Sequence, residues 1–394
     1  MDKLKIKSLT VEHRQRLQAG YCFIGFSSNL DRHKTKVSLK TTELMIKVDD
    51  EVYTVDTKAF FEMNMNSFHG LQGKETFISF RFITASEKQF DAELLKVNDT
   101  ACKFQRIILS VDNTEGQVEV ASIKCSNCES SITSDKKVSV KRVLELPSSN
   151  LDVSDWFCHR HGDEKLFDES QNNAEPSWTN CFDEKTQQFQ PRINDIFYGP
   201  FCLLMNSKHF DAGRMREKRK QVYCRRCLQL LGENNGSSIK FWWESIKFDD
   251  RLFFDVASSI DLVKHVIRNH LACEAFISPV VKIIFECTLP SEDKKVHLLI
   301  QVMEKNLQLL RLNLEDFQFV QQSTVKVMYL QLNHTSEDDK KTLDYWQKEI
   351  SVSNYEMSFK MFHTFCEYLK AQSELIPEYF RSNNGFQLSY IPYC

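Results

Sequence analysis

Glycine and proline are scarce in this sequence, with 11 and 8 residues among 394. That scarcity excludes collagen-like proteins and glycine- or proline-rich low-complexity proteins. Neither sign of charge dominates, because 51 lysines and arginines stand against 54 aspartates and glutamates, which gives a net charge of −3. The chain is therefore neither a globally basic nucleic-acid coat nor an acidic tail protein.

Long hydrophobic runs are also missing. No stretch reaches the roughly 18 apolar residues that a transmembrane helix needs, and residues 1–7 lack the continuous apolar run of a signal peptide. We therefore expect no membrane partner and no export. The expected location is the cytoplasm, with the nucleus as a second location. In such reducing compartments the 13 cysteines are expected to be buried thiols or metal ligands.

Length and aromatic content predict two or three domains with a large apolar interior, since the chain has 394 residues and 30 phenylalanines. The predicted fold class is α+β, in three segments. Residues 1–143 are expected to form a β-rich, sandwich- or barrel-like domain. Residues 144–236 are expected to be a loop-rich segment that closes a zinc-knuckle site, and residues 237–394 an α+β domain.

Hydrophobic periodicity supports this division. Apolar and polar residues alternate in short runs, which predicts strands at 37–39, 44–48, 52–55, 78–82 and 118–120. Residues 163–190 are polar and without a period, which predicts a loop. In the last segment, apolar stripes predict helices over 262–271 and 359–369. Further apolar runs predict strands at 280–287, 296–303, 307–312, 325–329 and 386–390.

Two Cys-x-x-Cys pairs carry the clearest chemistry: Cys125 with Cys128, and Cys224 with Cys227. A two-residue gap lets two thiolates converge on one ion at about 2.3 Å, so two such knuckles can complete a tetrahedral, structural zinc site. The long separation of the pairs requires the chain between them to loop out and return. Two unrelated buried pairs, or a redox pair, are the alternatives, although the flanks lack the βαβ context of thioredoxin-like proteins.

A second cluster lies in the polar middle segment, at Trp156, Cys158, His159 and His161. Cysteine and histidine side chains could contact a metal here, but adjacent residues do not easily close a cage by themselves. The alternative is an exposed loop anchored by Trp156.

No nucleophile is identified. The sequence has no GxxxxGK[ST], HExxH or GxSxG motif, so it does not indicate an NTPase, a zinc protease or a hydrolase of the common types. Cys366 lies on the apolar face of a predicted helix and is expected to be a core thiol, while Cys394 is the terminal residue. The catalytic cysteine is therefore unknown.

A basic run precedes the second cysteine pair. It contains Arg214, Arg216, Lys218, Arg219, Lys220, Arg225 and Arg226. Glu217 interrupts the run and aromatic residues are few around it, so direct nucleic-acid binding is not expected.

Taken together, these motifs resemble the HECT-like ubiquitin-protein ligase family, whose members are described as binding a ubiquitin-conjugating enzyme. The matching residues are spread over the chain. They are Cys125-x-x-Cys128, Leu146-Pro147-Ser148, Trp156-x-Cys158-His159, Phe197, 201–206, Cys224-Arg225-Arg226-Cys227, Leu231-Gly232-Glu233, Trp346, Ile350-Ser351-Val352 and Gly385-Phe386-Gln387.

The resemblance implies a ubiquitin-protein ligase that accepts ubiquitin from a conjugating enzyme and passes it to protein substrates, among them cyclin-like proteins, and to itself. The implied contact with the conjugating enzyme lies near residues 249–271, on the predicted helix with Leu262, Val266 and Leu271. Core packing explains these three residues equally well.

The same resemblance implies an alternative role as a non-enzymatic inhibitor or assembly partner of the metal-dependent endonuclease of messenger-RNA 3′-end processing. A loop from Leu146 and Pro147 to His159 would enter the partner's cleft. Cys158 would then contact the partner's metal in trans, with Trp156 as a hydrophobic anchor.

Overall fold

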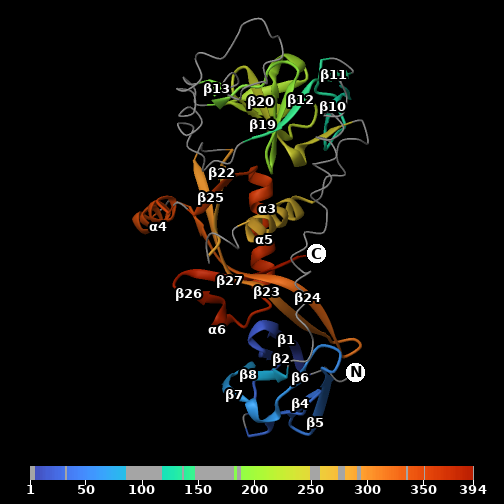
Figure 1. The fold of residues 1–394 in the computed structure, drawn as a ribbon, viewed down its shortest axis with the longest axis vertical. Coiled ribbons are helices and arrows are strands. Elements are labelled where there is room, and N and C mark those ends of the chain that lie inside the picture. The colour runs from blue at the N-terminus through green and yellow to red at the C-terminus, as the bar shows by residue number, and fades with distance from the viewer. Residues whose placement is uncertain are drawn as a thin grey trace, which may run out of the picture.

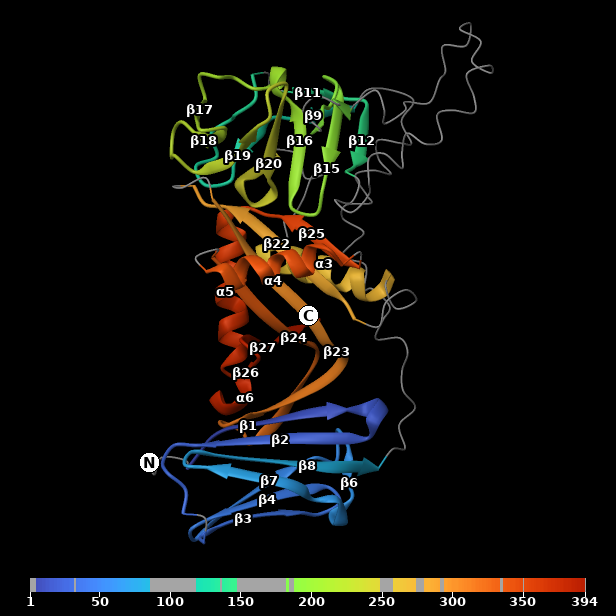
Figure 2. The same ribbon diagram turned by 90° about the vertical axis from the view of Figure 1, so that its left-hand side faces the viewer.

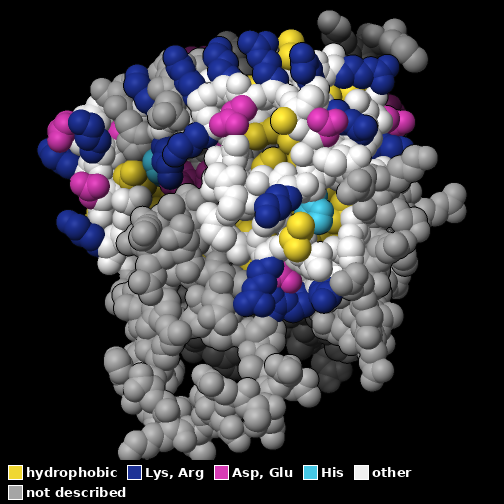
Figure 3. Space-filling model, turned by 90° about the horizontal axis from the view of Figure 1, so that it is seen from above, with side chains coloured by type: hydrophobic (Ala, Val, Ile, Leu, Met, Phe, Trp, Pro, Cys, Tyr) yellow, Lys and Arg dark blue, Asp and Glu magenta, His cyan; other side chains and the backbone are white. Residues whose placement is uncertain are grey.

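The computed structural model describes residues 5–31, 33–85, 118–134, 137–146, 182–183, 188–248, 258–273, 280–290, 294–333, 336–349 and 351–393. These residues form three modules stacked along the long axis of the molecule (Figures 1 and 2). The central module, built from residues 258–393, lies between an N-terminal module of residues 5–85 and a cysteine module of residues 118–248. The outer end of the cysteine module exposes many lysine and arginine side chains (Figure 3).

The N-terminal module is made of eight strands, four of which the alternating runs at 37–39, 44–48, 52–55 and 78–82 predict. Its strands are β1 (Ile6–Arg14), β2 (Ala19–Phe26), β3 (Thr35–Leu39), β4 (Glu43–Val48), β5 (Glu51–Asp56), β6 (Glu62–Met63), β7 (His69–Lys74) and β8 (Phe77–Ala85), with 3-10 turns η1 (Gln15–Leu17) and η2 (Met65–Ser67). Strands β3, β4 and β5 form a sheet of their own. Apolar residues of this sheet and of β1, β2 and β8 share one buried core.

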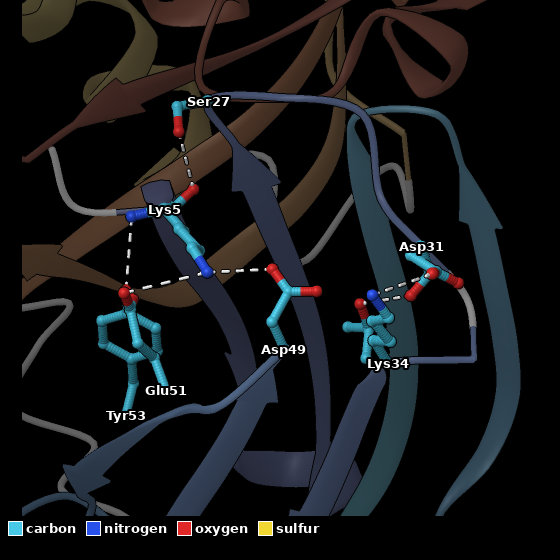
Figure 4. Close-up of polar contacts among 8 residues, drawn as sticks. Lys5, Ser27, Asp31, Lys34, Asp49, Glu51 and Tyr53 are labelled. Atoms are coloured by element: carbon cyan, nitrogen blue, oxygen red, sulfur yellow. Dashed lines mark hydrogen bonds and ion pairs between the residues drawn. The ribbon is translucent and has the colours of Figure 1, made fainter.

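Polar contacts tie the start of β1 to the β4–β5 hairpin (Figure 4). The ammonium group of Lys5 lies 2.9 Å from a carboxylate oxygen of Asp49. The backbone N–H of Lys5 donates to the Tyr53 hydroxyl at 3.3 Å, and its carbonyl accepts from Ser27 at 3.2 Å. The hydrogen bond with Asp49 raises the pKa of Lys5. These contacts hold the start of β1 against the β4–β5 hairpin.

The central module has a long sheet covered by helices. It contains α3 (Ser259–Cys273), β22 (Lys282–Thr288), β23 (Lys295–Asn313), β24 (Gln318–Leu332), α4 (Glu337–Gln347), β25 (Val352–Glu356), α5 (Phe359–Ser373), α6 (Glu378–Arg381), β26 (Ser382–Asn383) and β27 (Phe386–Pro392). The predicted helices and strands of this segment are confirmed, except that the runs at 296–303 and 307–312 form one strand, β23. Helix α4 was not predicted, because its residues are mostly polar.

One sheet joins the N-terminal and central modules. Strand β1 pairs with β2 on one side and with β23 on the other, so that eleven strands form a single sheet. The pairing of β1 with β23 brings together residues about 300 positions apart, such as Thr10 and Arg311. Hydrophobic periodicity predicts strands, but it does not predict partners this distant along the chain.

A buried ionic cluster holds this junction. The carboxylate of Glu12, fully buried, lies 2.5 Å from the ammonium of Lys326 and 2.8 Å from the guanidinium of Arg14. The Tyr390 hydroxyl donates to it at 2.6 Å, and Arg14 also pairs with Glu304 at 2.8 Å. These groups come from β1, β23, β24 and β27. Burial acts to raise the pKa of Glu12, but Lys326 and Arg14 outweigh it and hold the pKa below its usual value.

The cysteine module is built on a second sheet. Its elements are β9 (Val118–Ala121), β10 (Ile123–Cys125), β11 (Lys137–Val140), β12 (Arg142–Glu145), β13 (Phe182–Asp183), β14 (Gln188–Phe189), β15 (Asp195–Tyr198), β16 (Cys202–Asn206), η6 (Ser207–His209), β17 (Met215–Lys218), β18 (Gln221–Cys224), β19 (Leu230–Asn234), β20 (Ser238–Trp242), η7 (Trp243–Ser245) and β21 (Ile246–Phe248). Seven strands pair in the order β12-β15-β16-β20-β19-β18-β17.

The prediction of a loop-rich segment is wrong for residues 188–236, which contain strands β14 to β19. The physical reason is that both faces of β15 and β16 are covered. Ile196 and Leu203 enter the main core, whereas Phe197 and Leu204 pack in a smaller cluster on the other face. Doubly covered strands are continuous apolar runs without alternation. Most of the predicted 163–190 loop lies outside the described residues.

The division of the chain at residues 143/144 and 236/237 stays a prediction. In the structure the first boundary falls inside β12 and the second lies two residues before β20, and both strands belong to the seven-stranded sheet. A change in composition marks a polar stretch of sequence, whereas strand pairing between distant residues determines which residues share a sheet.

Replacing Glu12 with glutamine should destabilise the fold by about 3 kcal/mol or more, because Lys326 and Arg14 would lose a buried partner. Urea unfolding measures this. Glu43→Gln is the control, since Glu43 pairs with Lys40 at 2.8 Å on the surface, where a pair contributes about 1 kcal/mol or less.

The effect of Glu12→Gln should also depend on pH. A carboxyl group with a lowered pKa stabilises the fold above its unfolded-state pKa, and this contribution is lost as pH falls through the folded-state pKa. The stability difference between the two proteins should therefore be full near pH 7 and narrow below the usual glutamate value of 4.5. A difference that stays constant from pH 7 to pH 3 contradicts this assignment.

Candidate metal centre of four cysteines

The two predicted cysteine pairs meet in the structure. The Sγ atoms of Cys125, Cys128, Cys224 and Cys227 all lie within 4.8 Å of one another. Cys125 and Cys227 are 3.6 Å apart, and so are Cys128 and Cys224. Four sulfurs placed 2.3 Å from a central zinc ion in a tetrahedron are about 3.8 Å apart. The cluster therefore fits a tetrahedral ion with only small shifts of its side chains.

Both pairs lie in the same local backbone structure. Cys125 ends β10, its carbonyl accepts from the N–H of Glu129 at 2.9 Å, and its own N–H donates to the carbonyl of Ser130. Cys224 ends β18, and it makes the corresponding bonds with Leu228 and Gln229 at 2.8 Å. Backbone N–H groups of Asn127, Ser130 and Gln229 are hydrogen-bonded to the sulfurs of Cys125, Cys128 and Cys227, which suits bound thiolates.

The fifth residue of each turn has left-handed backbone geometry. Glu129 has φ +56° and Leu228 has φ +61°, a conformation that costs a residue with a side chain about 1 kcal/mol or more. Glycine would adopt this conformation without that cost. Non-glycine residues in this conformation persist where the surrounding structure enforces it, and here both adjoin the four sulfurs.

Hydrogen bonds join the two turns without a metal. The Gln229 side-chain amide donates to the Ser126 hydroxyl at 3.0 Å. That hydroxyl donates in turn to the backbone carbonyl of Glu244 at 2.8 Å, and the Ser126 N–H donates to the carbonyl of Ser245. Strand β10 also pairs with β21, with Cys125 opposite Ile246. Sequence reasoning missed Ser126 and Gln229, because neither residue type marks a metal site.

The thiols of Cys125 and Cys227 differ in acidity. Burial raises the pKa of Cys125 to about 12. Burial also acts to raise that of Cys227, but hydrogen bonds from the Gln229 backbone and the Asn127 side chain outweigh it and lower the pKa to about 6. A metal would have to displace the proton of Cys125, so its binding should weaken as pH falls.

Glu244 connects the cysteine cluster to the central module. Its backbone contacts Ser126, and its carboxylate accepts hydrogen bonds from the hydroxyls of Ser259, at 2.6 Å, and Ser358. Ser259 is the first residue of α3 and Ser358 is the N-cap of α5. A carboxylate at two helix N-termini is electrostatically favourable.

Further contacts fix the same interface. Lys240, in β20, lies 2.9 Å from the carboxylate of Glu233 and 2.8 Å from that of Glu356 in the central module. The ring of Phe201 lies 6.0 Å from that of Phe285. The cysteine module is therefore held against the central module by charge, hydrogen bonds and aromatic packing.

The residues predicted to contact the conjugating enzyme are not on the surface. Leu262, Val266 and Leu271 are exposed by only 5, 3 and 2% and belong to the main core. The interpretation of these side chains as a docking surface is therefore wrong. The apolar stripe of α3 packs inward, where α3 contacts α5.

The predicted metal contact in trans falls outside the described residues. Pro147, Trp156, Cys158 and His159 all lie there. Leu146 is described: it is half-buried, and its N–H donates to the carbonyl of Tyr198 at 2.7 Å.

Cys366 has the properties of a core thiol, as expected from the sequence. It is 9% exposed, and burial raises its pKa to about 12. It borders a cavity of about 260 Å³ that is also lined by Phe362 and His363, but the His363 ring stacks on Phe359. Burial also raises the pKa of Cys287 to about 12. A nucleophilic thiol needs a lowered pKa and access to solvent, which neither cysteine has.

Comparison with known proteins supports the resemblance noted in the sequence. A family model described as HECT-like Ubiquitin-conjugating enzyme (E2)-binding matches residues 12–388. Searches of curated proteins and of solved structures found no match. Within the described part of the chain, no helix combines the length and apolar character that crossing a membrane requires.

Replacing Glu244 with glutamine should lower the free energy of unfolding by about 2 kcal/mol, because two hydrogen bonds to a charged acceptor weaken and two helices lose a favourable charge. Glu129→Gln is the matched control, since among the described residues that exposed carboxylate pairs only with Lys247, at 3.3 Å. Urea unfolding of both variants checks this, and equal losses would argue against a linking role for Glu244.

Proposed function

The chain belongs to the HECT-like ubiquitin-conjugating enzyme (E2)-binding family, and on that premise we propose that it is a ubiquitin-protein ligase. It accepts ubiquitin from a conjugating enzyme and promotes its transfer to protein substrates and to itself. The observation that carries this proposal is the extent of the family match, which includes residues of all three modules. The E2-binding description therefore concerns the whole assembly and not a single module.

We also propose that the four-cysteine cluster holds one structural zinc ion. The set of four sulfur donors and their spacing support zinc, which favours tetrahedral thiolate sites. Such an ion would fix the two turns against each other. Through Ser126 and Glu244 it would also support the N-termini of α3 and α5. Its role is architectural, because all four positions around the ion are filled by protein ligands.

The route of ubiquitin transfer is constrained by the described thiols. Outside the metal cluster, burial raises the pKa of Cys22, Cys202, Cys287 and Cys366. These thiols are poorly suited to accept ubiquitin as a thioester at neutral pH. We therefore propose that transfer does not pass through them. The alternative role as a nuclease inhibitor stays a prediction, because Trp156, Cys158 and His159 lie outside the described residues.

Cys128→Ser should abolish binding of the single zinc ion, which native mass spectrometry would detect as a loss of mass. It should also lower stability, by about 4 kcal/mol where free zinc exceeds its dissociation constant a thousandfold. Cys202→Ser is the control, because Cys202 lies outside the cluster. A wild-type chain that carries no metal after purification with added zinc would overturn the zinc assignment.

Adding the chain to a conjugating enzyme charged with ubiquitin should speed ubiquitin discharge and produce self-modification that resists thiol reductants. Cys366→Ser should keep the rate within about twofold, since a thiol with so high a pKa is almost fully protonated at pH 7. No acceleration by the wild-type chain would contradict the ligase proposal. A thioester adduct lost specifically in Cys366→Ser would contradict the assigned route.

A further inference from the structure

Strand β17 forms the outer edge of the seven-stranded sheet. Among the described strands it pairs only with β18. The hairpin is closed at the pair Lys218–Gln221, with Arg219 and Lys220 between them. In a two-residue hairpin this closing pair is hydrogen-bonded, and the pattern then alternates along the strand. The backbone groups of Met215 and Glu217 therefore face the outer edge, where an edge strand can accept a further strand.

Positive charge is concentrated on this hairpin. Residues 214–226 contain seven basic residues and one acidic residue, a net charge of +6, whereas the whole chain has −3. All seven basic side chains are exposed. We call β17, β18 and their turn, with these side chains, the basic hairpin; its cations are Arg214, Arg216, Lys218, Arg219, Lys220, Arg225 and Arg226.

Glu217 interrupts the basic run in the sequence, but in the folded hairpin it lies on the other face of β17 from Arg216 and Lys218. Directly paired residues share a face of the hairpin, so Arg216 and Lys218 lie with Tyr223 and Gln221. Glu217 instead lies with the buried Val222 on the opposite face, and its carboxylate accepts a hydrogen bond from the Asn234 amide at 2.8 Å. One face of β17 is therefore uniformly positive.

The turn carries a conformational cost. Arg219 has φ +52° and Lys220 has φ +65°. Both are in the left-handed region, where hairpin turns favour asparagine and glycine, and each side chain there costs about 1 kcal/mol or more. Asparagine or glycine would adopt this turn at lower conformational cost, and strain of this kind indicates a functional constraint.

Two simpler explanations cover only part of this pattern. Charged residues protect edge strands from aggregation, which would account for Arg216 and Lys218 within β17 but not for Arg219 and Lys220 in the turn. Arg225 and Arg226 lie within the second cysteine turn, where positive charge offsets a thiolate site. Neither explanation requires cations at the strained tip.

We propose that the basic hairpin binds an extended, carboxylate-rich segment of a partner protein, which adds to β17 as a further strand. The partner's backbone would pair with the outward groups of Met215 and Glu217. Carboxylates at alternate positions, about 7 Å apart along a strand, would meet Arg216 and Lys218. Arginine binds carboxylates through paired, charge-assisted hydrogen bonds.

The structure favours a peptide over a nucleic acid. Single-stranded nucleic acids bind through exposed aromatic side chains on which their bases stack. The aromatic residue of the hairpin, Tyr223, is half-buried, and its hydroxyl donates to Gln221. An open strand edge adds affinity for a peptide backbone. This interaction is independent of the proposed ligase activity.

The charge requirement is tested with a fluorescent ten-residue peptide in which glutamate alternates with threonine, using fluorescence anisotropy and the full zinc-loaded chain. Arg216→Glu with Lys218→Glu should weaken binding at least about tenfold, because repulsion replaces attraction. The control is Lys340→Glu with Lys341→Glu on α4, an equal change of charge at exposed positions. It should shift affinity less than about twofold. Equal weakening by both pairs would overturn the proposal.

Strand addition is tested separately from charge. Glu217→Pro removes the outward N–H without removing a cation and should abolish peptide binding, whereas Glu217→Gln should not. A peptide with alternate backbone nitrogens methylated should also fail to bind the wild-type chain, which keeps the test valid if Glu217→Pro unfolds. Undiminished binding in both cases would overturn the proposal. So would tighter binding of a duplex or single-stranded RNA at the same salt concentration, which would indicate a nucleic-acid surface.

Discussion

The structure depends on four sulfur atoms that come from distant parts of the chain and meet at one point. Closing a loop of this length costs conformational entropy, so other interactions must contribute. Strand β10 pairs with β21 beside the first turn, and Gln229 and Ser126 link the two turns by a hydrogen bond. The ligand geometry is therefore largely formed by the protein itself. A bound ion would strengthen an arrangement that backbone pairing already specifies.

Two polar junctions connect the three modules. Glu244 connects the first cysteine turn to the N-termini of α3 and α5. At the opposite end of the central module, Glu12 connects strands β1, β24 and β27 of the eleven-stranded sheet. Both junctions use a carboxylate whose partners come from different segments. Removing either carboxylate leaves charged or polar groups without their partner, so the three modules are coupled and not merely tethered.

This coupling limits where partners can bind. The apolar face of α3 is occupied by the core, so Leu262 and its neighbours are unavailable to a conjugating enzyme. The described thiols outside the cluster are also enclosed, and burial raises the pKa of Cys366 and Cys287. Open strand edges and charged ends remain accessible. The cysteine module combines both features at β17, at the edge of its sheet opposite β12 (Figure 2).

The sequence by itself determined the local features. Alternating runs predicted β3, β4, β5 and β8 of the N-terminal module, apolar stripes predicted α3 and α5, and the Cys-x-x-Cys spacing identified the four sulfurs, because each signal lies within a few adjacent residues. Only the tertiary structure decided how these parts meet. Strands β15 and β16 escaped prediction because both faces are buried, and the pairing of β1 with β23 joins residues about 300 positions apart. The stripe of α3 looks alike in sequence whether it faces a partner or the core, so its role followed only from what packs against it.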